Sequence, residues 1–274
     1  MQGAVDQVFA ANRAVGRVAL DVEFRDGVSR RMRLHEAGSI RVRFPGAPAQ
    51  DLEAILLNTA GGLAGGDRTD IDVRVGAGAA LTLTSASAEK VYRSLGPDAL
   101  LSVSLKVAQR ARLAWLPREM ILFDRSRLRR TIDVDLAEDA GLLLAEAVIF
   151  GRADMGEVVA QGHFFDRWRV RRGGKLIYAE SIRLDGAIAT KLEQAAVAAG
   201  CAAVATIMMV PGDATMTAAL SECKDRFRGD VGISTWNGMS VARFCAPDGD
   251  SLRHDIVFAM TIMMRAPMPR LWLN

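Results

Sequence analysis

The sequence is poor in cysteine and aromatic residues and has no long apolar run. Its three cysteines, Cys201, Cys223 and Cys245, form no CxxC or CxxH pair, so we expect neither a disulfide framework nor a closed zinc site. The longest apolar stretch, residues 256–264, is far shorter than the roughly 20 residues that cross a bilayer. The N-terminal residues carry Asp6 and no continuous apolar core, which excludes a secretory signal. We therefore expect a soluble, cytoplasmic protein with no membrane partner.

The chain also lacks a strong excess of either charge. Lysine and arginine number 35 against 32 aspartates and glutamates, for a net charge of +3 over 274 residues. The acidic residues are interspersed with the arginines, which favours solvated strand faces over a nucleic-acid surface. We therefore expect no nucleic-acid partner. A basic nucleic-acid-binding module stays an alternative, and a steep salt dependence of affinity would mark it.

The glycine-rich segment GGLAGGD, residues 61–67, invites comparison with a phosphate-binding loop. A Walker A loop continues with lysine and then serine or threonine, whereas Gly66 is followed by Asp67 and Arg68. The carboxylate of Asp67 would repel phosphate, and the dinucleotide fingerprint G-x-G-x-x-G is absent. The glycines therefore predict a tight backbone path or close strand packing.

Motifs for catalysis are missing as well. No G-x-S-x-G elbow is present, and none of the three histidines, His35, His163 and His254, lies beside a nucleophile motif. A β-helical carbohydrate hydrolase or lyase is the rival hypothesis, which needs two closely placed carboxyl groups. The aromatic content of only 6% disfavours it, because such enzymes use aromatic sugar platforms. We expect that the protein is not an enzyme.

Apolar and polar residues alternate strictly through much of the first two-thirds of the chain. The clearest segments are residues 18–24, 40–44 and 71–75. Period-two alternation predicts strands with one buried face and one solvated face.

A weak repeat accompanies this alternation. Two apolar positions, a five-residue link and two further apolar positions recur at an interval of about thirty residues. The three units are Val73 and Val75 before Leu81 and Leu83, Leu105 and Val107 before Leu113 and Trp115, and Val134 and Leu136 before Leu142 and Leu144. Because the links keep one length, we favour a β-helix-like stack over a meander of ordinary hairpins in a sandwich.

The pattern changes after Gly186. A hairpin around Gly173 and Gly174 precedes this point. The later elements are predicted as a helix at 189–199, a strand at 204–210, a helix at 214–227 capped by Asp213, a hairpin at 232–244 turning at Asn237-Gly238, and a helix at 251–265. The last helix is apolar on more than one face, so it is buried in the core or docked on a partner, and core packing is favoured.

We expect one domain, 1–274, with a β-rich body at 1–186 and a mixed α/β part at 187–274. The fold class is mostly β, with two or three α-helices late in the chain.

Carboxylates follow the repeat units. Glu89, Glu119 and Glu146 come after the first, second and third unit, and stacking would bring them near one another. Such groups could pass a divalent cation along a wet route without holding it. The simpler interpretation is surface or salt-bridged carboxylates opposite Lys90, Arg118 and Arg152. No histidine or cysteine cluster indicates a tight transition-metal site.

Six segments in unbroken order resemble the motifs of one known family. They are LHEAGSIRVRFP at 34–45, LLNTAGGLAGGD at 56–67, TSASAEKVYRS at 84–94, LPREMILFDRSRLRR at 116–130, EAVIFGRADMGE at 146–157 and PRLW at 269–272. Together they resemble the urease accessory protein UreD family, also called UreH. Within the third segment, Ser85 and Glu89 stand where many members carry other residues.

The resemblance implies a largely β, helically wound fold with no enzymatic activity. It implies a urease maturation factor, a scaffold that binds the urease apoprotein, UreF and, through UreF, the GTPase UreG. A dimer of such heterocomplexes is one assembly it allows. Nickel would be in transit through an internal passage, with no stably bound cofactor. The groups that we predict to line this passage are Asp67, Glu89, Glu146 and Glu180, with Arg93 and Arg152 as structural ion-pair partners.

Overall fold

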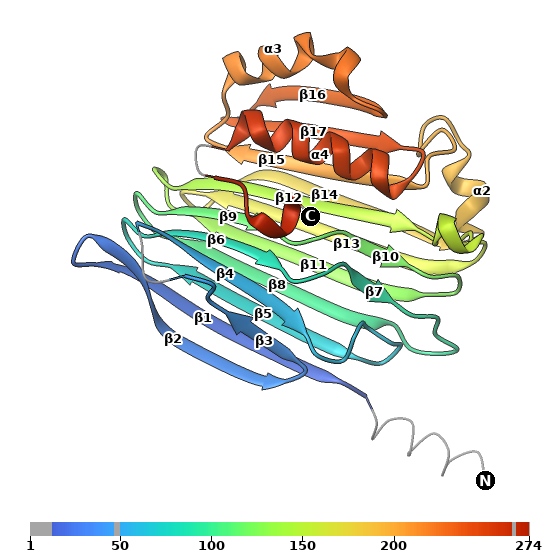
Figure 1. The fold of residues 1–274 in the computed structure, drawn as a ribbon, viewed down its shortest axis with the longest axis horizontal. Helices are drawn as coiled ribbons and strands as arrows, with labels where there is room; N and C mark the ends of the chain where they lie inside the picture. Colours follow the sequence, from blue (N-terminus) through green and yellow to red (C-terminus); the bar gives the residue numbers. More distant parts are fainter. Residues whose placement is uncertain (1–12, 47–49, 265–266, 274) are drawn as a thin grey trace.

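The computed structural model describes residues 13–46, 50–264 and 267–273. Within these ranges the chain forms two stacked β-sheets, with helices over one end of the second sheet (Figure 1). The first sheet has the strand order β14 (Lys175–Gly186), β13 (Gly162–Arg172), β11 (Arg127–Leu136), β8 (Ala99–Val107), β5 (Arg68–Val75), β1 (Val15–Arg25) and β2 (Val28–Gly38). The second follows the order β16 (Asp230–Trp236), β17 (Met239–Ala246), β15 (Ala203–Val210), β12 (Gly141–Phe150), β9 (Arg112–Leu116), β6 (Ala80–Ser85), β4 (Asp51–Asn58) and β3 (Ile40–Arg43). Two short strands join it: β10 (Met120–Leu122) pairs with β12, and β7 (Glu89–Val91) pairs with β10.

The stacked coils predicted from the repeat are confirmed. The first strands of the three units, β5, β8 and β11, pair in parallel, and so do their second strands, β6, β9 and β12. Equivalent residues form rungs, such as Val73, Leu105 and Val134, which are fully buried. These rungs from both sheets make one continuous apolar core, as a solenoid requires.

The links from the first sheet to the second explain why successive coils keep the same register. Each link ends in a fully buried alanine, Ala79, Ala111 or Ala140, whose amide donates to the residue three positions earlier. The carbonyl of Ala79 accepts from Arg112, and that of Ala111 accepts from Gly141. A methyl group fills the narrow corner of each coil, and every corner is hydrogen-bonded to the next.

Hairpins close both edges of the first sheet. β2 pairs antiparallel with β1 at one edge, and β14 pairs antiparallel with β13 at the other. The predicted turn at Gly173-Gly174 is confirmed, because both glycines have positive φ, of 55° and 78°. The turn at Asn237-Gly238 between β16 and β17 is confirmed in the same way, with φ of 48° and 73°.

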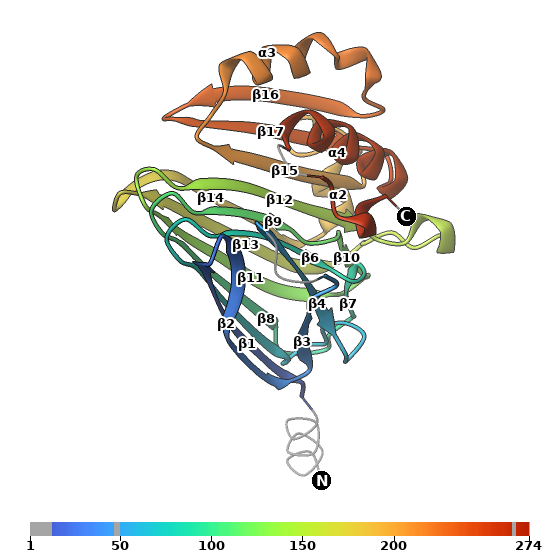
Figure 2. The same cartoon turned by 60° about the vertical axis from the view of Figure 1, so that its left-hand side comes forward.

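The second sheet continues beyond the coils as the antiparallel strands β15, β17 and β16, and helices cover this extension (Figure 2). The helices of this part are α2 (Ile188–Leu192), α3 (Ala214–Glu222) and α4 (Gly249–Met263). Asp213 caps α3 as predicted, since its side chain accepts from the amide of Met216. The final helix packs on β15 and β17 and buries Ile256 and Met260, so core packing is confirmed.

Two predicted helices are shorter than expected. The alanine-rich segment leaves the α-helix after Leu192, because its small side chains offer little apolar surface to bury. α3 ends at Glu222, and the polar residues that follow form a 3₁₀ turn (Lys224–Arg226). The last helix begins at Gly249, and the predicted end at Arg265 lies outside the described residues.

The C-terminal segment returns to the middle of the second sheet. After α4, a 3₁₀ turn (Arg270–Trp272) places the indole of Trp272 in a buried site, 2% exposed. Its Nε1 donates to the carbonyl oxygen of Leu116, 3.0 Å away, at the end of β9. The segment thereby fastens the chain that follows β9. Among the described residues, no helix combines the length and the apolar character needed to cross a membrane.

Replacement of Trp272 tests this attachment. Trp272→Ala removes a buried indole and its hydrogen bond, so we expect the free energy of unfolding to fall by about 3 kcal/mol. Leu273→Ala is the matched control, because the neighbouring side chain is 64% exposed and should change stability by no more than about 0.5 kcal/mol. Urea denaturation of the purified chain measures both, and equal losses would contradict the attachment.

Candidate functional site

In two successive coils the strand of the second sheet is broken, and the two breaks lie next to each other. β6 ends at Ser85 and β7 begins at Glu89, while β9 ends at Leu116 and β10 begins at Met120. The third coil has no such break, because β12 runs on and pairs with β9 near its start and with β10 near its end. The two bulges, residues 86–88 and 117–119, open the wall of the solenoid.

A cavity of about 260 Å³ lies behind this opening. Its outer part is lined by Gly61, Ser87 and Lys90, which are exposed. Its inner part reaches Arg130 and Glu146, which are buried between the two sheets. The cavity therefore connects the surface of the second sheet to charged groups in the core.

The inner end of the cavity is a buried ion network. Arg130 of β11 is 2% exposed and forms a two-pronged pair with Asp166 of β13, at 2.9 Å from Nε to Oδ1 and 2.6 Å from Nη2 to Oδ2. Its Nη1 donates to Oε2 of Glu146, which lies on β12 in the opposite sheet. The indole of Trp115 donates to Oε1 of Glu146 at 2.7 Å, and Trp168 donates to Asp166 at 3.0 Å. Every carboxylate oxygen in the network thus has a donor.

The network is a polar layer between two apolar clusters. On each of three strands the charged residue stands between inward-facing apolar neighbours that belong to different clusters. These triplets are Leu128, Arg130 and Ile132 on β11, Leu144, Glu146 and Val148 on β12, and Phe164, Asp166 and Trp168 on β13. Two carboxyl groups share one guanidinium here. Burial raises the pKa of Glu146, and Arg130 and Trp115 oppose that rise.

Glu89 lies in the same cavity, nearer its mouth. Nδ2 of Asn58 donates to its Oε1 at 3.0 Å. Burial raises the pKa of Glu89 to about 7, and the hydrogen bond from Asn58 only partly offsets this rise. Two of the predicted lining residues, Glu89 and Glu146, therefore meet in one cavity, and both have a raised pKa.

Two other predicted residues lie elsewhere. Asp67 accepts from the amides of Ala14 and Ala64, at 2.9 and 2.8 Å, and so closes the glycine-rich loop. Glu180, on β14, accepts from the hydroxyl of Tyr178 at 2.5 Å and from Arg243 at 2.7 Å. Neither carboxylate lines the cavity.

Three further charged residues from the sequence pattern lie outside the lining of the cavity. Arg152 forms an ion pair with Glu157 at 2.7 Å. Arg93 is exposed and makes no ion pair within the described part of the chain. Glu119 precedes the inward-facing Met120 and points the other way, toward Arg118 and Arg253. The salt-bridged interpretation is therefore confirmed for Glu119.

The glycine-rich loop borders the cavity and is closely packed, as its composition indicates. Gly62 has φ of 151°, and a Cβ atom there would lie 2.6 Å from the carbonyl oxygen of Lys90. A Cβ atom on Gly65 would lie 1.9 Å from Oγ of Ser94. Both positions exclude a larger residue.

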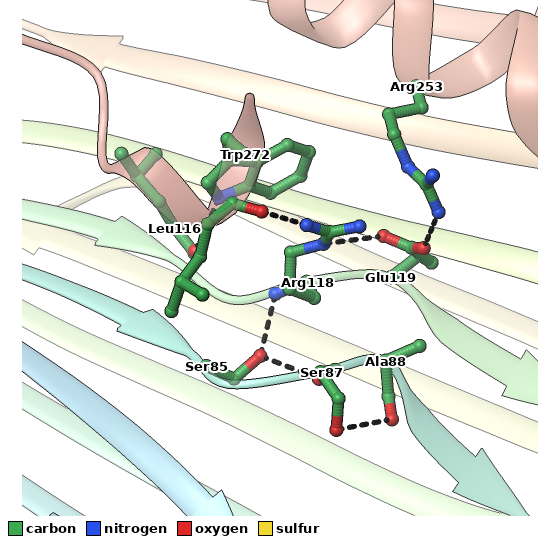
Figure 3. A network of polar contacts seen from close by, with 9 residues as sticks. Ser85, Ser87, Ala88, Leu116, Arg118, Glu119, Arg253 and Trp272 are labelled. Atoms are coloured by element: carbon green, nitrogen blue, oxygen red, sulfur yellow. Dashed lines mark hydrogen bonds and ion pairs between the residues drawn. The ribbon is translucent and has the colours of Figure 1, made fainter. Parts of the chain in front are cut away.

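The C-terminal segment reaches the rim of the cavity through Arg118 (Figure 3). The amide of Arg118 donates to Oγ of Ser85 at 2.8 Å. Its guanidinium donates to the carbonyl oxygen of Leu271 and lies 5.4 Å from the ring centroid of Trp272. Arg118 lines the cavity, so the rim and the chain end are one connected unit.

Residues 14–273 match the family model described as UreD urease accessory protein. The chain belongs to the UreD family. Urease accessory protein UreD of Rhodopseudomonas palustris strain ATCC BAA-98 / CGA009 is 56% identical over 271 residues, which cover 98% of this chain and 96% of that protein. The protein of the same name from strain BisA53 is 55% identical over 269 residues, or 97% and 93% of the two chains. Urease accessory protein UreD 1 of Bradyrhizobium sp. strain ORS 278 is 52% identical over 271 residues, or 99% and 98%.

The UreD match covers both sheets, the cavity and the C-terminal segment. The resemblance read from the sequence motifs is therefore confirmed. Across the described residues of this UreD-family chain, no group of three or more histidine, cysteine, aspartate or glutamate side chains is placed to hold a metal ion. The cavity instead offers two carboxyl groups and one buried guanidinium.

The ion network predicts a large effect of Arg130→Met. Loss of the guanidinium leaves two buried carboxyl groups without their partner, so the free energy of unfolding should fall by about 3–5 kcal/mol. Arg129→Met is the control, because Arg129 lies on the solvated face of the same strand and should cost about 1 kcal/mol or less. Urea denaturation measures both. Addition of Glu146→Gln and Asp166→Asn to Arg130→Met should restore part of the loss, and a further fall would contradict the network.

The raised pKa of Glu89 predicts a pH-dependent stability. Its folded value of about 7 exceeds the ordinary value of 4.5, so the folded state binds the proton more tightly than the unfolded state. Ionisation then favours unfolding, and stability due to this group falls as pH rises from about 4.5 to 7. Glu89→Gln removes the effect, so its stability relative to wild type should rise by about 3 kcal/mol across that window. Denaturation of both proteins from pH 5 to pH 8 measures this, and a constant difference would contradict the shift.

Proposed function

We propose that this chain is a urease maturation factor, a non-enzymatic scaffold that helps to deliver nickel to the urease active site. Membership of the UreD family supports the urease accessory role. The observation that carries the nickel part is the cavity, which opens through the wall of the solenoid and holds Glu89 and Glu146. Nickel is the cargo in this proposal and has no resident site on the chain.

The chemistry of the two carboxyl groups suits transfer better than storage. The pKa of Glu89 is raised to about 7, so a proton competes with a cation for this carboxylate near neutral pH. Arg130 also competes with the cation for Glu146. Stable divalent nickel sites use several nitrogen, oxygen or sulfur ligands, whereas this cavity offers isolated oxygens. A cation would therefore bind weakly and move on, with water completing its coordination.

The partners follow from the same role. We infer that the chain acts in the cytoplasm, binding the urease apoprotein and UreF, with UreF holding the GTPase UreG nearby. UreG would supply the GTP hydrolysis that releases nickel. The glycine-rich loop of this chain is not expected to bind a nucleotide, because the carboxylate of Asp67 accepts a hydrogen bond from the loop amide of Ala64. Two such heterocomplexes would pair in the full assembly.

A carbohydrate-active enzyme is less well supported, because Trp115 is the one aromatic side chain in the described lining of the cavity.

Copurification with nickel analysis tests both parts of the proposal. The tagged chain is coexpressed with the urease subunits, UreF and UreG, and urease nickel content is measured at limiting nickel supply. Glu89→Gln should still recover the partners but lower the nickel content of urease several-fold, because it removes an ionisable oxygen from the cavity. Glu138→Gln is the matched control, since that side chain is exposed on the link between β11 and β12.

The experiment distinguishes failure of the scaffold role from failure of the nickel route. If the wild-type chain recovers neither UreF nor urease, the scaffold role is wrong. If Glu89→Gln and Glu146→Gln both recover the partners and give wild-type nickel content, the scaffold stands and the cavity is not the route.

A further inference from the structure

Two cysteines that are distant in sequence meet at one carbonyl group. Cys245 lies on β17, and its Sγ donates to the carbonyl oxygen of Ala198 at 3.3 Å. The amide of Cys201 donates to the same oxygen at 2.8 Å. Pairing of β15 with β17 places Val204 opposite Cys245, which keeps the two segments side by side.

The turn that presents Cys201 is held in place. Ala199 and Gly200 both have positive φ, of 49° and 87°, and the amide of Gly200 donates to Leu192 at 2.8 Å. Ala198 is buried in the apolar cluster that also contains Leu192. Cys201 and Cys245 are each partly exposed, so a small solute can reach them. The fold therefore holds Cys201 and the thiol of Cys245 at one carbonyl group, and both residues are partly exposed.

We propose that Cys201 and Cys245 form a modification site, at which a peroxide oxidises the two thiols to an intramolecular disulfide. The bond would join the turn after α2 to β17, and the closed loop would contain β15, α3 and β16. Cys223 lies elsewhere in the fold, at the C-cap of α3. The site lies outside the cavity, so the proposal does not depend on nickel transfer.

The oxidation proceeds in two balanced steps. The thiolate of Cys201 attacks the peroxide, so a sulfur–oxygen bond forms, the oxygen–oxygen bond breaks and hydroxide leaves. The sulfur of Cys245 then attacks the sulfenic acid of Cys201, so the disulfide forms and the sulfur–oxygen bond breaks. The two thiol protons leave with the two oxygens as water. In the second step the thiol of Cys245 gives its proton to the departing hydroxyl group of the sulfenic acid, which leaves as water.

Peptide mapping of the folded chain tests the site. The purified protein is treated with hydrogen peroxide, and its free thiols are then alkylated without reduction. Combined cleavage after lysine, arginine and glutamate puts each cysteine on its own peptide, because Glu222 separates Cys201 from Cys223 and Arg243 precedes Cys245. We expect two of the three thiols to disappear, a cross-linked peptide pair that carries Cys201 and Cys245, and full recovery of the thiols with dithiothreitol.

Three single variants make the assignment specific. Cys223→Ser should form the same cross-link as wild type, whereas Cys201→Ser and Cys245→Ser should each lose it. The wild-type map does not depend on the folding of any variant. The proposal is wrong if folded wild-type protein keeps all three thiols under peroxide that oxidises the unfolded chain. It is also wrong if the cross-link involves Cys223, or if Cys201 proceeds to sulfinic acid with Cys245 still free.

Discussion

The interaction on which this fold depends is the buried guanidinium of Arg130. It forms a two-pronged pair with Asp166 in its own sheet and contacts Glu146 across the core in the other sheet. Removing three charged groups from water is costly unless each is paired and hydrogen-bonded, and here the indoles of Trp115 and Trp168 complete the set. The network thus permits a polar layer between two apolar clusters of the same core.

The opening in the second sheet gives this layer access to the surface. A continuous parallel sheet leaves no gap in its wall, since each strand bonds to both neighbours. The breaks after β6 and β9 coincide because stacked coils share one register, while β12 continues past them and carries Glu146. Glu89 begins the short strand after the first break. The same repeat that builds the core therefore places two carboxyl groups along one cavity.

The sequence was sufficient for the architecture and only partly for the site. The rungs of Val73, Leu105 and Val134 were predictable because alternation and a constant link length together define stacked coils. Glu89 and Glu146 were found as carboxylates that follow the repeats, but Arg130 and Asp166 were not. Both stand in phase with inward-facing apolar residues, so the alternation carried this signal. What the sequence does not show is that the two meet in one ion network, because that depends on the pairing of strands. The shorter α3 likewise reflects what the helix can bury, which tertiary packing decides.

The attachment of Trp272 has a consequence for the order in which the molecule is completed. The coils are local in sequence, so each can stack on its predecessor as the chain leaves the ribosome. The rim of the cavity is different, because Leu116 and Arg118 receive contacts from residues 271 and 272, which follow them by 153 and 156 residues. The solenoid can therefore assemble during synthesis, whereas the rim is finished only once residues 271 and 272 have been made and have folded back. A nascent or C-terminally clipped chain would carry the coils and both carboxyl groups without the finished rim.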